Sequence, residues 1–69
     1  MVEVFSTNVQ RKLQARRMLA LLQEKFPGVK ANLDMHDSDR VLRVEATELD
    51  PDQIIAFVTD MGFACAILD

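Results

Sequence analysis

Hydrophobic and polar positions alternate with two different periods along this chain, and each change of period marks a new element. In residues 8–29 the apolar positions recur at steps of one, three and four, which places them on one side of a helix: Met18, Leu19, Leu22 and Phe26. Pro27 and Gly28 then end the helix, since proline has no amide proton and glycine accepts a left-handed turn. A long helix with one apolar stripe, turned sharply into a strand, is expected to lie across a sheet.

Shorter stretches alternate with a period of two, as half-buried strands do. Val2 and Val4 alternate with Glu3 and Phe5, which predicts a first strand with a valine face. Residues 29–36 and 41–46 predict two further strands, and the turn at residues 36–39 joins them into a hairpin.

Capping signals predict where both helices begin. Thr7 and Gln10 fit a capping box ahead of the first helix, which is expected to run to about Phe26. Asp50 as the cap, with Pro51 in the first turn, indicates the start of a second helix. The apolar stripe of that helix consists of Ile54, Phe57, Val58 and Met61. Gly62 is expected to end it, and residues 63–68 to form a fourth strand.

The predicted order is therefore strand-helix-strand-strand-helix-strand, as two βαβ halves. Right-handed crossovers give an α+β, ferredoxin-like sandwich: an antiparallel four-stranded sheet of order 4-1-3-2 with two helices on one face, in one domain over residues 1–69. Three loops, at residues 6–10, 36–39 and 61–63, should then share one end of the molecule. The uncovered face of the sheet is expected to include Phe5, and with Val41 and Leu68 it offers a patch for homodimerisation.

Charge is distributed unevenly along the chain, whose net charge is −3. The first helix is basic, with Arg11, Lys12, Arg16 and Arg17, whereas most acids follow residue 33. The acidic balance argues against a nucleic-acid binder, and no run of apolar residues is long enough to span a membrane. The sequence shows no signal-peptide pattern, and the single cysteine, Cys65, cannot form an internal disulfide, so a cytoplasmic location is expected.

One family shows the same succession of features. A helix running into Pro27-Gly28-Val29, a hairpin, and Ile54 followed by Gly62-Phe63 and Cys65 make the chain similar to the heavy-metal-associated domain, the family of copper chaperones and of the terminal modules of metal-pumping ATPases. The resemblance covers nearly the whole chain and implies the ferredoxin-like scaffold. In that family the metal is held by Cys-x-x-Cys at the first loop and helix start.

The metal-binding motif does not carry over. Residues 8–15 contain no cysteine, histidine, methionine or carboxylate, and Arg11 and Lys12 would repel a cation. The alternative metal ligands are His36, Asp37 and Asp39 in the hairpin turn, where a solvated turn is the simpler interpretation. Cys65 is expected in the core.

The sequence contains no motif that indicates an enzyme. There is one histidine and one cysteine, and no glycine-rich phosphate loop, since Gly28 and Gly62 are the only glycines. The first loop lacks the glycine-rich arginine cradle of an acylphosphatase, and Phe5 alone does not make the aromatic platform of an RNA-binding sheet.

Two functions remain, neither of which needs a cofactor. The first is a non-enzymatic module, like a metallochaperone without its metal ligands, that binds a protein partner or a second copy through Arg11, Lys12, Arg16, Arg17 and Phe5. The second is a metal- or small-molecule-binding protein that uses the end with three loops, with Asn8, His36, Asp37 and Phe63 as contacts.

Overall fold

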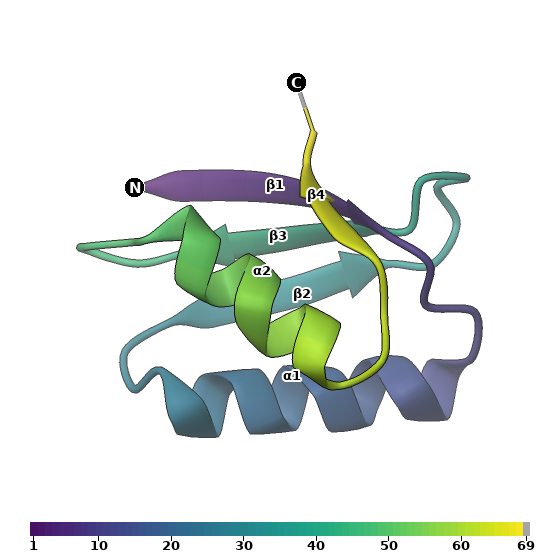
Figure 1. Cartoon of the computed structure of the whole chain (residues 1–69), viewed down its shortest axis with the longest axis horizontal. Helices are drawn as coiled ribbons and strands as arrows, with labels where there is room; N and C mark the ends of the chain where they lie inside the picture. The colour runs from purple at the N-terminus through teal and green to yellow at the C-terminus, as the bar shows by residue number, and fades with distance from the viewer. Residues whose placement is uncertain (69) are drawn as a thin grey trace.

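The computed structural model describes residues 1–68. Its elements, in chain order, are β1 (Val2–Thr7), α1 (Lys12–Lys25), β2 (Lys30–Asp34), β3 (Val41–Glu45), α2 (Pro51–Asp60) and β4 (Cys65–Ile67). Figure 1 shows α2 crossing in front of the strands and α1 running along their lower edge.

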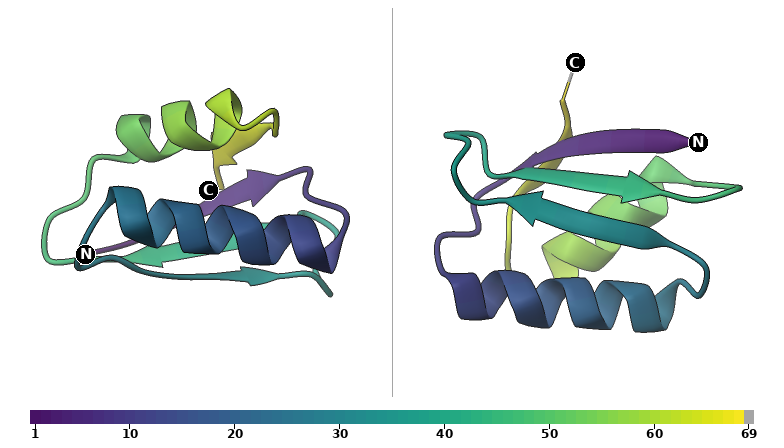
Figure 2. Two further views of the ribbon diagram at one scale, coloured as in Figure 1. Left: turned by 90° about the horizontal axis from the view of Figure 1, so that it is seen from below. Right: turned by 180° about the vertical axis from the view of Figure 1, so that it is seen from behind.

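The four strands form one antiparallel sheet of order β2-β3-β1-β4. Counted from the opposite edge, this is the expected order 4-1-3-2. Both helices cover the same face of the sheet, as Figure 2 shows in two further views. The ferredoxin-like α+β fold predicted from the sequence is therefore confirmed.

The core lies between the sheet and the two helices. Its fully buried members come from β1, β3, both helices and the first loop: Phe5, Val9, Ala15, Met18, Leu22, Leu42, Val44, Ile54 and Val58. Leu19 and Phe26 pack against this core from the expected stripe of α1. The rings of Phe26 and Phe57 meet edge to face, with centroids 5.7 Å apart, and so join the end of α1 to α2.

The predicted facing of β1 is wrong. Phe5 is fully buried, whereas Val2 is 50% exposed. Residues paired across an antiparallel sheet point to the same face, and Phe5 pairs with Leu42, which is fixed in the core of the hairpin. Both alternations of β1 contain apolar residues, and the one that buries the larger phenylalanine ring prevails. Phe5 therefore does not belong to the uncovered face.

The start of α1 also differs from the prediction. The helix begins at Lys12, and the N–H of Arg11 donates to Oε1 of Gln14 at 3.2 Å. Thr7 and Gln10 form no capping box, because Thr7 ends β1 and its hydroxyl bonds to the hairpin. The start of α2 is as predicted: Oδ1 of Asp50 accepts the N–H of Asp52 at 3.1 Å. Gly62 follows with a φ of 97°, a conformation that suits glycine.

Candidate functional site

The three loops expected at one end of the molecule do lie together, on the right in Figure 1. Thr7 joins two of them. Its N–H donates to the carbonyl of Asp39 at 3.0 Å, and its hydroxyl donates to the carbonyl of Arg40 at 2.7 Å. The same hydroxyl accepts the N–H of Val9 at 3.4 Å. The first loop is thereby attached to the tip of the hairpin.

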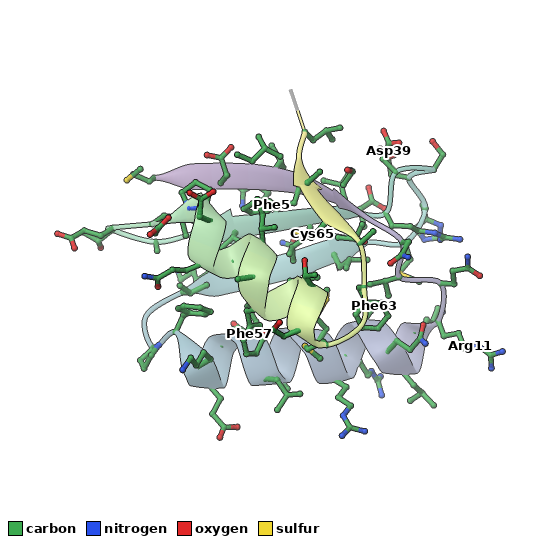
Figure 3. All side chains as sticks on the ribbon, in the orientation of Figure 1. Phe5, Arg11, Asp39, Phe57, Phe63 and Cys65 are labelled. Atoms are coloured by element: carbon green, nitrogen blue, oxygen red, sulfur yellow. The ribbon has the colours of Figure 1, made fainter. Side chains whose placement is uncertain are left out.

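Asn8 joins the third loop. Its Oδ1 accepts the N–H of Ala64 at 2.8 Å, across 56 positions of sequence. Phe63 and Cys65 are half-buried on either side of Ala64, and Cys65 pairs with Thr7 in the sheet. Figure 3 shows Phe63 and Cys65 along the segment that leads from α2 into β4. Consecutive residues at the end of β1 therefore connect all three loops, and we call these contacts the loop latch (Thr7, Asn8, Asp39, Arg40 and Ala64).

The carboxylates of the hairpin form its turn. Oδ1 of Asp34 accepts the N–H of His36 at 2.9 Å, and Oδ1 of Asp37 accepts the N–H of Asp39 at 2.8 Å. Arg40 closes the turn with a φ of 47°, which is uncommon outside glycine. Its N–H donates to the carbonyl of Asp37 at 3.0 Å, and its guanidinium donates to the carbonyl of Met35. The carboxylates of Asp34 and Asp37 therefore accept hydrogen bonds from within the hairpin itself.

The structure does not assemble the alternative metal ligands. Within residues 1–68, no group of three or more histidine, cysteine, aspartate or glutamate side chains is placed to hold a metal ion. His36, Asp37 and Asp39 lie exposed in one turn, with Asp39 at its tip in Figure 3. Cys65 is not in the fully buried core, but burial still raises the pKa of its thiol from 9.0 to about 11, which disfavours the thiolate that a soft metal requires.

The basic residues of the first helix do form one exposed surface. Arg11, Lys12, Arg16 and Arg17 are all exposed, and Arg11 projects away from the body of the molecule in Figure 3. Between them lies Leu13, which is 76% exposed, the largest exposed fraction among the large hydrophobic residues. Among the described residues the one ion pair joins Arg43 to Glu45, so the basic residues of α1 have no acidic partner there. We call this surface the basic face of α1 (Arg11, Lys12, Leu13, Arg16 and Arg17).

Sequence reasoning assigned Leu13 no role, although the helical period contained the necessary signal. Leu13 precedes Met18 by five residues, which turns its side chain about 140° away from the buried stripe. A leucine at that angle can only be exposed or covered by another chain.

The sequence also did not predict a shallow groove, which lies at the end of the molecule opposite the three loops. It has a volume of about 670 Å³ and lies between the turn after α1 and the loop before α2. Phe26, Val29, Leu49 and the buried Ile54 contribute its apolar lining, and Lys25 and Glu48 are also part of it. Its residues come from two turns that no motif distinguished, so only the folded chain brings them together.

Comparison with known proteins adds no relative. No family model, no curated protein and no solved structure matches the chain. Within the described residues no helix has the length and apolar character needed to cross a membrane. The resemblance to the heavy-metal-associated domain thus remains a prediction from the sequence.

Proposed function

We propose that this protein is a non-enzymatic interaction module, with the scaffold of a heavy-metal-associated domain, that binds an acidic protein surface through the basic face of α1. The observation that carries the proposal is the exposed Leu13 among four cations that have no acidic partner within residues 1–68. A partner that covers Leu13 would remove its apolar surface from water, and arginine is among the residues enriched at protein interfaces.

The charge of the site selects the partner. Arg16 and Arg17 follow Leu13 by three and four residues, so all three side chains are neighbours on the helix surface. Arginine binds carboxylates through two parallel hydrogen bonds, which favours a partner with several aspartates or glutamates. Leu13 would fit an apolar pocket or an apolar residue at the centre of that acidic surface.

The contacts at the end with three loops, which adjoins the first turn of α1, support a structural role for that end. The resemblance would place two metal-binding thiolates at the first loop and helix start, and this chain has the loop latch beside that region. Asn8, Asp34 and Asp37 are each hydrogen-bonded to backbone N–H groups. Because these side chains are engaged within the fold, we propose that the loop latch stabilises the fold. The proposal also includes a cytoplasmic location and the absence of a cofactor.

A defined peptide tests the proposal. A synthetic peptide that alternates pairs of glutamates with leucines is titrated into the protein at low and at moderate salt, and binding is measured by fluorescence anisotropy. We expect binding that weakens with salt, that falls at least about tenfold in Arg16→Glu plus Arg17→Glu, and that also falls in Leu13→Ser.

A matched control separates the site from total charge. Lys30→Glu plus Arg43→Glu changes the net charge by the same amount on the opposite side of the molecule, and it should leave binding within about twofold. Equal losses in both double variants would contradict the assignment to α1. Titration with Cu(I), Zn(II) or Ni(II) alone tests the second function: tight binding of one of them that is lost in His36→Ala would replace our proposal.

A further inference from the structure

The face of the sheet that the helices leave open has a pattern of charges that matches itself. Three rows cross this face in the register of the strands. The first is Lys30, Glu45 and Val2, the second is Asn32, Arg43 and Val4, and the third begins with Asp34 and Val41. These residues face away from the helices, since their neighbours Leu33, Leu42, Val44 and Phe5 point toward the core.

The charges on this face cancel, although the chain as a whole is acidic. Lys30 and Arg43 balance Asp34 and Glu45, and the ion pair between Arg43 and Glu45 has an N–O distance of 3.4 Å. Two copies of a protein with net charge −3 repel each other at most orientations. The basic face of α1 would also repel itself. The charges on the open face of the sheet cancel, so two copies that meet there avoid this electrostatic repulsion.

Symmetry then fixes how two copies would meet. Lys30 and Asp34 lie at opposite ends of β2, with Asn32 midway between them. A two-fold axis that runs across the strands through the middle row exchanges the two ends of β2. Lys30 of one copy is then placed over Asp34 of the other, and this pair occurs twice, as an isologous interface requires.

The same axis brings like apolar residues together. Val4 of one copy faces Val4 of the other, and the half-exposed Val2 and Val41 lie on either side of this contact. The Arg43 side chains also approach each other near the axis, and each keeps Glu45 as a partner, so the four charges remain balanced. An axis parallel to the strands, between β3 and β1, would instead place Glu45 over Val2 and Arg43 over Val4, and would leave Lys30 and Asp34 without an opposite charge. The axis across the strands places only Glu45 over an apolar residue, Val41.

We propose that the protein self-associates through the open face of its sheet, as a two-fold symmetric dimer with Lys30 of each copy against Asp34 of the other. The face is small: five residues by four strands measure about 17 Å by 15 Å. This is below the area of about 800 Å² per partner that stable complexes bury, so the dimer should be weak. Both helices point away from the contact, so dimerisation leaves the basic face of α1 accessible.

Sedimentation equilibrium up to about 1 mM protein measures the association directly. We expect a monomer–dimer equilibrium that Val4→Lys weakens at least about tenfold, because it adds two cations beside the two Arg43 side chains at the axis. Leu13→Lys is the matched control, since it introduces the same residue on the outer side of α1, and it should leave the equilibrium unchanged. Circular dichroism confirms that both variants fold.

Charge reversal at the edge strand gives a second and independent test. Lys30→Asp alone and Asp34→Lys alone each place like charges over one another and should weaken the dimer. The double variant Lys30→Asp plus Asp34→Lys restores opposite charges and the original net charge, and should recover the association of the unmodified protein. Both positions are exposed, but Asp34→Lys removes the hydrogen bond that Oδ1 of Asp34 accepts from the His36 N–H, so circular dichroism checks that each of these variants folds.

Three results would overturn the dimer: a monomer at every concentration, undiminished association of Val4→Lys, or a double reversal that associates no better than the single ones. None of them depends on the peptide titration that tests the basic face of α1. Loss of peptide binding in Arg16→Glu plus Arg17→Glu with an intact dimer would leave both proposals standing. A dimer that does not bind the peptide would contradict only the proposed function, and a monomer that binds the peptide would contradict only the dimer.

Discussion

Replacing Phe5 by alanine tests the placement on which the whole core depends. Phe5 is fully buried and pairs with Leu42 in β3 and with Ile67 in β4. A phenylalanine buries about 150–250 Å². At about 25 cal/mol per Å² this corresponds to about 4–6 kcal/mol, of which alanine keeps a part, so the loss agrees with the 3–5 kcal/mol typical of Phe→Ala in a core.

That loss is comparable to the total stability of so small a domain. A chain of 69 residues is expected to unfold at a cost of about 3–10 kcal/mol. Phe5→Ala should therefore be largely unfolded. Phe5→Leu keeps most of the apolar volume and should lower the free energy of unfolding by only about 1–2 kcal/mol.

Urea unfolding followed by circular dichroism measures both changes. Leu13→Ala is the control, because Leu13 is 76% exposed and its replacement should change the free energy of unfolding by no more than about 0.5 kcal/mol. Had Phe5 faced solvent, as the valine face of β1 implied, its replacement would behave like the control. A loss below about 1 kcal/mol in Phe5→Ala would refute the facing of β1 described above.

Three further predictions concern single contacts. Asn8→Ala removes the acceptor of the Ala64 N–H and should cost about 0.5–1.5 kcal/mol, together with faster hydrogen exchange of the Ala64 amide; unchanged exchange would show that the loop latch does not hold β4. Asp50→Ala removes the cap of α2 and should cost about 1 kcal/mol in urea unfolding, whereas Asp52→Asn two positions further along should cost less, and equal losses would argue against capping. Native Cys65 should react with iodoacetamide about 10–100-fold more slowly than in urea at pH 8, because burial raises its pKa from 9.0 to about 11 and lowers the thiolate fraction. The same shift makes the thiol favour folding below pH 9, and this contribution is lost as the pH rises toward about 11, so Cys65→Ala should flatten the fall in stability over that range.

The sequence alone determined the order of the elements, the strand order and the side of the sheet that the helices cover. The stripe of α1, the cap of α2 and the hairpin each rest on interactions between residues near in sequence, so spacing and residue type suffice to predict them. The handedness of the crossovers then leaves one strand order, and the three loops meet at one end as a consequence. The exposed cations of α1 followed from the same helical period.

The tertiary structure decided those features for which the local sequence pattern allowed two alternatives. β1 has an apolar residue on each face, and only its register against β3 and the size of the core settled that Phe5 points inward and the valines outward. Thr7 and Asn8 look like helix caps, and their side chains instead bond partners more than thirty positions away, which delays the start of α1 to Lys12. A side-chain hydroxyl or amide bonds whichever partner the fold brings to it, and no local pattern records partners so distant in the sequence.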